Sequence, residues 1–338
     1  MKKLKNILPV MVILVSAFFV LSCNEDIVVP PHDVNFDFYP YEYSDGHYFF
    51  DTLYKASFLD YYNNTTGTLT EHTIQNEVLV NDTATFEVWI KISITDSAGV
   101  FAYAHTMLYE QPVGGYSDTL KTGNPVLGKK MYGRFRRMHP YEYAMHSKPG
   151  FIYLKYTGED DVVAVTYKTS SGKLFGTPVS SAAPNDTLIL KLVQWAYLHP
   201  IDTPLAWELK LKNVYVLPYA VTTDGFELNV KYYSNGYQTH LPGFSKSIST
   251  MLDIDRYTGT TREPPPDGKF DLLEGYTIDF GTNELIFPTL RPFYDNLIRE
   301  GAGSIYWYPE LYTKSKSEAM NVENAYDYRI LGKYRYYP

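Results

Sequence analysis

The chain has 338 residues, with 30 Lys and Arg against 38 Asp and Glu, which gives a formal net charge of −8. This acidic balance argues against nucleic-acid binding, which needs a basic surface, and against electrostatic docking on anionic lipid. The length is enough for two or three domains, each with its own core. The 33 tyrosines favour β-structure, because aromatic side chains fit pleated surfaces.

Residues 1–22 have the layout of a secretory signal peptide. Three lysines among the first five residues precede an apolar run from Ile7 to Leu21, which is short for a spanning helix. The run ends in Val-Leu-Ser-Cys23, a lipobox in which Cys23 would carry a lipid. Cys23 is the only cysteine, so no disulfide partner competes for it. We predict an outer-membrane-anchored lipoprotein on the periplasmic or cell-surface face. The alternative is an ordinary cleaved signal that contains a cysteine.

The next segments are interpreted as a tether and a first β domain. Residues 23–45, interrupted by Pro30-Pro31, are predicted to be a lipid-anchored tether. Residues 46–130 are predicted to form a β-sandwich-like domain. Within it, apolar and polar side chains alternate over residues 85–94, the period of a strand with one buried face. A turn ending at Gly99 leads to the expected partner strand at residues 101–109.

A second β domain is predicted over residues 131–243. Its expected strands are residues 151–156, 162–167, 187–193, 207–216, 226–232 and 237–240. The first two flank a turn from Gly158 to Asp161 and are interpreted as a hairpin. The last two enclose Asn235-Gly236, and Asn-Gly between strands is a strong hairpin signal.

The last predicted unit, residues 244–338, begins with a proline-rich break. A strand pair at 275–280 and 284–288, a helix at 309–321 and a strand at 326–336 follow. Residues 143–154 align without gaps on residues 276–287, and both read as strand, tight turn and strand. The fold class is therefore mainly β: two or three β-sandwich-like or hairpin-rich modules with one short C-terminal helix.

A series of motifs carries a resemblance to a known family. In order, they are Phe86-Glu-Val-Trp-Ile90, His139-Pro-Tyr-Glu-Tyr143, Leu205-Ala-Trp-Glu-Leu-Lys-Leu-Lys-Asn-Val-Tyr215, Leu252-Asp-Ile-Asp-Arg256, Pro266-Asp-Gly-Lys-Phe-Asp271, Gly275-Tyr-Thr-Ile278, Leu285-Ile-Phe-Pro288 and Arg291-Pro-Phe293. The series covers roughly residues 80 to 336. It resembles the soluble segments of the SprA (Sov) family, giant outer-membrane translocon proteins of type IX secretion and gliding motility.

The departures from the family limit what the resemblance implies. SprA proteins are several times longer than this chain and form a transmembrane pore. Asn283-Glu284 stands where the family usually has a Gly-Arg turn, and Tyr294 replaces a glycine. The resemblance implies a soluble module on a lipid anchor, defined by family-like residues that mostly shape its fold. These residues are Trp89, Trp207, Asn213, Tyr215, Asp267, Gly268, Phe270, Asp271, Phe287 and Pro288.

The expected function is a non-enzymatic interaction or structural module associated with type IX secretion or gliding motility. Its partners would be other envelope or secretion proteins. One alternative is a surface glycan-binding lipoprotein, for which Trp195 or Trp307 would stack on the sugar. Another is a truncated gene model of a larger SprA-like translocon.

No catalytic motif is present in the sequence. Neither G-x-S-x-G, H-E-x-x-H nor G-x-G-x-x-G occurs, and the eight histidines are scattered and expected at the surface or as caps. We therefore predict that the protein is not an enzyme. The rival class is a glycosidase that uses two of the many carboxylates.

Asp253, Asp255, Asp267 and Asp271 form the one candidate metal site. The first two share a face if their segment is a strand, and the proline-rich loop would fold the other two back toward them. Hard oxygen ligands suit Ca²⁺, although the spacing is not that of an EF-hand. The alternative is a set of turn and cap carboxylates. No other cofactor is predicted.

A basic cluster stands out in this acidic chain. It consists of Lys129, Lys130, Arg134, Arg136 and Arg137. Two interpretations are open: a docking patch for an acidic partner and a solvated linker between domains.

Overall fold

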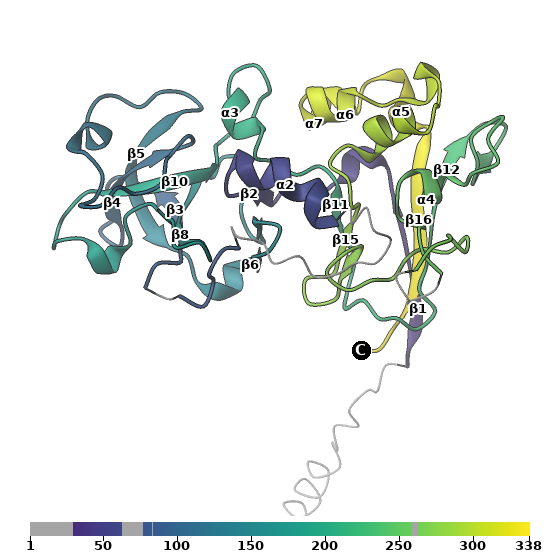
Figure 1. Cartoon of the computed structure of the whole chain (residues 1–338), viewed down its shortest axis with the longest axis horizontal. Coiled ribbons are helices and arrows are strands. Elements are labelled where there is room, and N and C mark those ends of the chain that lie inside the picture. Colours follow the sequence, from purple (N-terminus) through teal and green to yellow (C-terminus); the bar gives the residue numbers. More distant parts are fainter. Residues whose placement is uncertain (1–29, 63–76, 83, 259–262) are drawn as a thin grey trace, which may run out of the picture.

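The computed structural model describes residues 30–62, 77–82, 84–258 and 263–338. Cys23 and the signal segment lie outside these residues. The fold is mainly β, as predicted, and the described residues form four sheets. Figure 1 shows a barrel-containing lobe at one end, a lobe built on β1, β12 and β16 at the other, and the short strands β2, β6, β11 and β15 between them.

Five strands close into a small barrel. They are β3 (Glu87–Ile92), β4 (Val100–His105), β5 (Lys130–Arg137), β8 (Val163–Lys168) and β10 (Leu188–Gln194). Their order is β10-β4-β5-β3-β8, and β8 pairs back with β10. The β10–β4 pair is parallel, the other pairs are antiparallel, and β9 (Leu174–Phe175) extends from β8. The interior is filled by Trp89, Phe135, leucines of β10 and small alanines, as a barrel of so few strands requires.

The barrel crosses the predicted domain boundary at residues 130 and 131. The expected strands at 85–94 and 187–193 are present as β3 and β10. However, β4 pairs with β5 and β10 and not with β3. The predicted hairpin of 151–156 with 162–167 is wrong, because β7 and β8 belong to different sheets. The alternation of apolar and polar residues in β3 did not indicate a barrel, because both faces of this strand are buried. Val88 packs on the outside of the barrel and Trp89 packs inside it.

Two three-stranded sheets form the middle of the molecule. One has the order β2 (His47–Phe49), β7 (Phe151–Leu154), β6 (Tyr143–His146), and the other β11 (Val214–Val216), β15 (Glu284–Ile286), β14 (Ile278–Asp279). The aligned segments 143–154 and 276–287 are the two hairpins β6–β7 and β14–β15. Gly150 and Asn283 take positive φ in their turns, as expected.

The far lobe is built on an antiparallel sheet in the order β1 (His32–Phe38), β16 (Tyr328–Tyr336), β12 (Glu227–Tyr233), β13 (Tyr237–Gln238). The tether prediction for residues 23–45 is wrong from His32 onward, because β1 pairs with β16 along its whole length. Val34, Phe36, Tyr41 and Tyr43 are buried in the core of this lobe. The β12–β13 hairpin turns at Asn235-Gly236, as predicted.

The helices are short and lie around the sheets. They are α2 (Thr52–Tyr62), α3 (Pro204–Trp207), α4 (Ile248–Met251), α5 (Leu297–Arg299), α6 (Glu310–Thr313) and α7 (Lys316–Ala319). The predicted helix at 309–321 is split into α6 and α7 because Ser315 caps α7 in a reciprocal bond with Glu318. Within the described ranges, no helix has the length and apolar character needed to cross a membrane.

The middle core connects the two lobes. It contains residues of the barrel's outer face (Val88, Val163, Val165), of α2 (Tyr54, Phe58) and of both three-stranded sheets (Ile152, Val214, Ile286). The other face of β11 and β15, with Tyr215 and Leu285, packs in the core of the far lobe. The β11–β15–β14 sheet therefore lies between two cores, and the largest hollow described below opens beside it.

Candidate functional site

A groove of about 840 Å³ lies between α2, residues 207–212, residues 289–299 and residues 312–313. Its apolar wall includes Phe49, Trp207, Leu211 and Leu290. Its charged wall consists of Lys55, Lys210, Lys212, Arg291 and Arg299 against Glu208 and Asp295. The groove is therefore cationic although the chain as a whole is acidic. Such a concave, partly apolar surface with a few charged groups is typical of a ligand site.

Four of the five basic side chains already have a carboxylate partner. The pairs are Lys55 with Glu208, Lys210 with Asp45 at 2.7 Å, Arg291 with Asp295 at 2.7 Å and Arg299 with Asp253 at 2.7 Å. Both carboxylates of the groove wall, Glu208 and Asp295, are thus held by basic side chains.

Lys212 is the exception in the groove. Its side chain is buried, with 7% of the residue exposed. Its Nζ donates to the carbonyl oxygen of Tyr312 at 3.2 Å and lies 3.7 Å from the ring centroid of Trp207. Among the described residues, no carboxylate lies within salt-bridge distance of it. Burial, and then the nearby Lys210 and Lys55, lower the pKa of Lys212 to about 7.

A second unsatisfied group lies in the same wall. The Thr289 hydroxyl is buried and has no hydrogen-bond partner within the described structure. Buried polar groups are normally paired, so these two groups mark a place where a ligand can bond. A carboxylate fits both: its charge would pair with Lys212 and its oxygen would accept from Thr289.

The family-like segment 205–215 builds this wall. The short helix α3 ends at Trp207 and places its ring under Lys212. Asn213 is fully buried, and its Nδ2 donates to the carbonyl oxygens of Phe287 at 2.8 Å and Thr289 at 3.1 Å. Asn213 thereby fixes the chain leaving β15, which carries Thr289 into the groove. Sequence reasoning did not single out Lys212; its alternation with leucines in this segment was the only signal.

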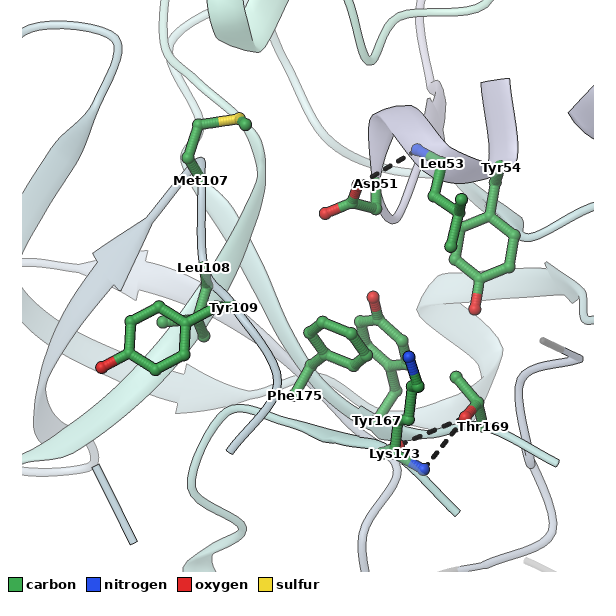
Figure 2. Close-up of a pocket in the computed structure, with 10 residues that line it drawn as sticks. All are labelled: Asp51, Leu53, Tyr54, Met107, Leu108, Tyr109, Tyr167, Thr169, Lys173 and Phe175. Atoms are coloured by element: carbon green, nitrogen blue, oxygen red, sulfur yellow. Dashed lines mark hydrogen bonds between the residues drawn. The ribbon is translucent and has the colours of Figure 1, made fainter. Parts of the chain in front are cut away.

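A smaller pocket of about 290 Å³ lies beside the start of α2, and Figure 2 shows the residues that line it. The rings of Tyr167 and Phe175 stack at a centroid distance of 4.8 Å. Asp51 accepts from the backbone N–H of Leu53 at 3.1 Å, as drawn in Figure 2, and contacts the buried Lys191 at 2.5 Å. Its one carboxylate is thus neutralised, which makes this pocket a weaker candidate than the groove.

The predicted calcium ligands are used inside the fold. Asp253 binds Arg299 at 2.7 and 3.0 Å, and Asp271 accepts from the backbone N–H groups of Arg256 and Tyr257. Asp255 accepts from the backbone N–H groups of Asp267 and Gly268, at 3.2 Å each. In the part of the chain that the structure describes, no group of three or more His, Cys, Asp or Glu is arranged to hold a metal. The geometry is that of the alternative, turn and cap carboxylates.

The structure buries one of the two predicted stacking tryptophans and half-buries the other. Trp195 is only 5% exposed and packs in the barrel core, so its assignment as a glycan-stacking residue is wrong. Trp307 is half-buried, donates to the carbonyl oxygen of Ala302 at 2.8 Å and meets Tyr294 edge to face. Both rings are used for packing, because the aromatic excess of this chain fills its cores.

Several histidines are buried or largely buried, against expectation, and two of them contact one glutamate. His47 is fully buried and its Nε2 lies 3.0 Å from the Oε1 of Glu284. The Nε2 of His146 lies 2.8 Å from the other oxygen of Glu284. Because β2 and β6 carry the histidines and β15 carries the glutamate, this cluster joins the two three-stranded sheets.

Comparison with known proteins assigns no relative: no protein-family model matches the chain, and no curated protein matches it. The functional argument therefore depends on the groove and on the motifs of the sequence.

Proposed function

We propose that the chain is a non-enzymatic cell-envelope lipoprotein, an SprA-like interaction module associated with type IX secretion or gliding motility. Its groove would hold an acidic segment of a partner protein. The observation that carries this proposal is Lys212, a buried amine without a carboxylate in the wall of a cationic groove. The colinear motif series of residues 80 to 336 supports the family association.

An acidic segment fits the groove for two physical reasons. A buried charge is costly unless it is paired, so a carboxylate that reaches Lys212 gains more than it would on the surface. The rest of the chain is acidic and repels acidic partners, which confines their binding to the groove and gives specificity. The apolar wall at Phe49 and Leu290 would accept an apolar residue next to the acidic one.

The groove favours binding over glycoside hydrolysis. A glycosidase needs one carboxyl group that stays protonated and a second that is free to attack or to activate water. In the groove wall, Glu208 is held by Lys55 and Asp295 by Arg291. Each carboxylate is thus paired with a cation and not free to act on a substrate.

The partner can be identified by affinity purification of the tagged, full-length protein from solubilised envelopes. We expect secretion or motility components with acidic segments to be recovered with the wild type and lost with Lys212→Met. Lys269→Met is the matched control, because Lys269 is exposed and does not line the groove, and it should leave the recovery unchanged. If nothing is recovered, or if Lys212→Met recovers the same proteins, the groove is not the partner site.

The lipid anchor is tested separately. We expect Cys23 to incorporate a palmitate analogue during growth, because it closes the lipobox and is the only thiol in the chain. Cys23→Ser should lose the label and appear in the soluble fraction. Equal labelling of the wild type and the variant would contradict lipidation at this residue, without bearing on the groove.

A further inference from the structure

The sequence Pro-Tyr-Glu-Tyr occurs twice, at residues 40–43 and 140–143. Each copy forms a 3-10 turn directly after a sheet strand: Pro40–Glu42 after β1 and Pro140–Glu142 after β5. In each, the glutamate accepts from the backbone N–H three residues earlier, Glu42 from Tyr39 at 2.7 Å and Glu142 from His139 at 2.6 Å. The two turns therefore have the same local structure.

Each turn presents a pair of stacked rings. Tyr39 and Tyr41 have centroids 5.3 Å apart and an interplanar angle of 12°. His139 and Tyr141 have the same centroid distance, 5.3 Å, and an angle of 5°. The proline between the two rings sets the spacing that places them face to face.

The strands next to the two turns also correspond. Phe38 of β1 lies opposite Ile330 of β16, and Ile330 lies opposite Val230 of β12. In the barrel, Met138 follows β5 and donates its N–H to the carbonyl oxygen of Val88 in β3. Val88 in turn lies opposite Val165 of β8. Met138, Val88 and Val165 thus correspond to Phe38, Ile330 and Val230.

Each lobe has an ion pair at the corresponding positions, but the acidic and basic residues are on opposite strands in the two lobes. Asp37 pairs with Arg329 in the far lobe, and Arg137 faces Glu87 in the barrel, at 3.9 Å. The two ring pairs thus have matching neighbours in the adjacent strands. The two sites can therefore be compared residue by residue.

The first ring pair is closed by a third ring, whereas no third ring among the described residues contacts the second. Tyr326 meets Tyr39 and Tyr41 edge to face, with centroid distances of 5.1 and 5.7 Å. Tyr41 is consequently only 6% exposed, whereas Tyr141 is 66% exposed. Tyr326 lies four residues before Ile330. The residue at the corresponding place, four residues before Val88, is Ala84. The second copy therefore lacks the residue that closes the first.

We infer that the His139–Tyr141 pair is a docking site for a tyrosine presented by an acidic segment of a partner protein. The first copy shows how a tyrosine binds such a pair. Edge-to-face aromatic contacts contribute about 0.5–1.5 kcal/mol each beyond the area they bury. The half-exposed Arg137 contacts Glu87 at 3.9 Å and donates to the carbonyl oxygen of Phe86 at 3.4 Å, and its exposed side is placed to meet a carboxylate beside that tyrosine. This site does not depend on the groove at Lys212.

The test uses the full-length protein and two fluorescently labelled peptides, Ser-Asp-Tyr-Asp-Ser and its Tyr→Ala counterpart, followed by fluorescence polarisation. We expect the tyrosine peptide to bind at least fivefold more tightly. Tyr141→Ala should remove this preference, whereas Tyr141→Phe should retain it because the ring and not the hydroxyl makes the contact. Tyr219→Ala is the matched control, since Tyr219 is 63% exposed in the far lobe, where its ring meets Tyr336, and it should behave as the wild type.

A further variant supplies the missing ring within the chain. Ala84→Tyr is expected to close the His139–Tyr141 pair as Tyr326 closes its counterpart, and so to lose peptide binding while the protein stays folded. Equal binding of the two peptides to the wild type would overturn the inference. Loss of binding in Tyr219→Ala to the same degree as in Tyr141→Ala would overturn it as well.

Discussion

Replacing Lys212 by methionine is expected to stabilise the protein at neutral pH while it abolishes capture of acidic partners. The physical reason is the burial of an amine without a carboxylate, which lowers the pKa of Lys212 from the ordinary value of 10.5 to about 7. Each pKa unit corresponds to 1.36 kcal/mol, so the charged amine costs on the order of 4 kcal/mol in the folded state at pH 7. Methionine fills a similar volume without the charge.

The sign of the pH dependence follows from the same shift. Between pH 7 and 10.5 the unfolded chain holds a proton on this lysine that the folded protein does not. The contribution of Lys212 to the free energy of unfolding is therefore most favourable above pH 10.5, falls as the pH is lowered toward 7, and stays at the lower level below that. Urea unfolding of the wild type at several pH values from 7 to 10 should show this slope, and Lys212→Met should show a smaller one.

A neighbouring lysine is the control for this prediction. Lys210 is also largely buried, but it pairs with Asp45 at 2.7 Å. Asp45 offsets part of the burial cost of Lys210 and keeps Lys316 as a partner at 2.6 Å, so Lys210→Met is expected to raise the free energy of unfolding less than Lys212→Met does. If both variants destabilise the protein, or if the wild type shows no slope between pH 7 and 10, Lys212 is not a desolvated amine.

Partner binding should depend on pH for the same reason. A carboxylate that pairs with Lys212 favours its charged form, so binding above pH 7 takes up a proton and weakens as the pH rises. Calorimetry of an acidic peptide in buffers of different ionisation enthalpy measures that proton directly.

Features with a local cause could be predicted from the sequence. The hairpin at Asn235-Gly236 and the turn at Asn283 form because residues that tolerate positive φ stand between two short strands. The apolar run at 187–193 becomes β10, whose residues are all buried. In each case, the signal lies within a few residues of the structure that it determines.

Features that depend on distant pairing could not be predicted in this way. His32 pairs with Tyr336, almost the full length of the chain away, so nothing near His32 indicates that the segment is a strand of the sheet and not a tether. Closure of the barrel depends on β8 meeting β10, and the alternation in β3 is the same for a sandwich and a barrel. Lys212 and Glu284 acquire their roles from the elements that cover them, which residue pattern alone does not reveal.

Replacing Glu284 by glutamine is expected to lower the free energy of unfolding by about 3–5 kcal/mol, the cost of breaking a buried ion cluster on one side. Glu284 is fully buried, and its two oxygens lie 3.0 Å from His47 and 2.8 Å from His146. Burial alone would raise the pKa of Glu284, but the two histidines outweigh it and hold the pKa below its usual range.

The lowered pKa of Glu284 also sets the direction of its pH effect. Its stabilising contribution is present above the ordinary pKa of about 4.5 and is lost as the pH falls toward the lower pKa of the folded protein. Urea unfolding from pH 7 to 3 should therefore show a steeper loss for the wild type than for Glu284→Gln. Asp279→Asn is the control, because Asp279 is partly exposed and 3.7 Å from His146, and it should cost less than about 1 kcal/mol. A Glu284→Gln variant as stable as the wild type would show that the cluster does not hold the two sheets together, since the amide keeps the shape of the side chain but removes its charge and replaces one acceptor oxygen by an NH2 donor.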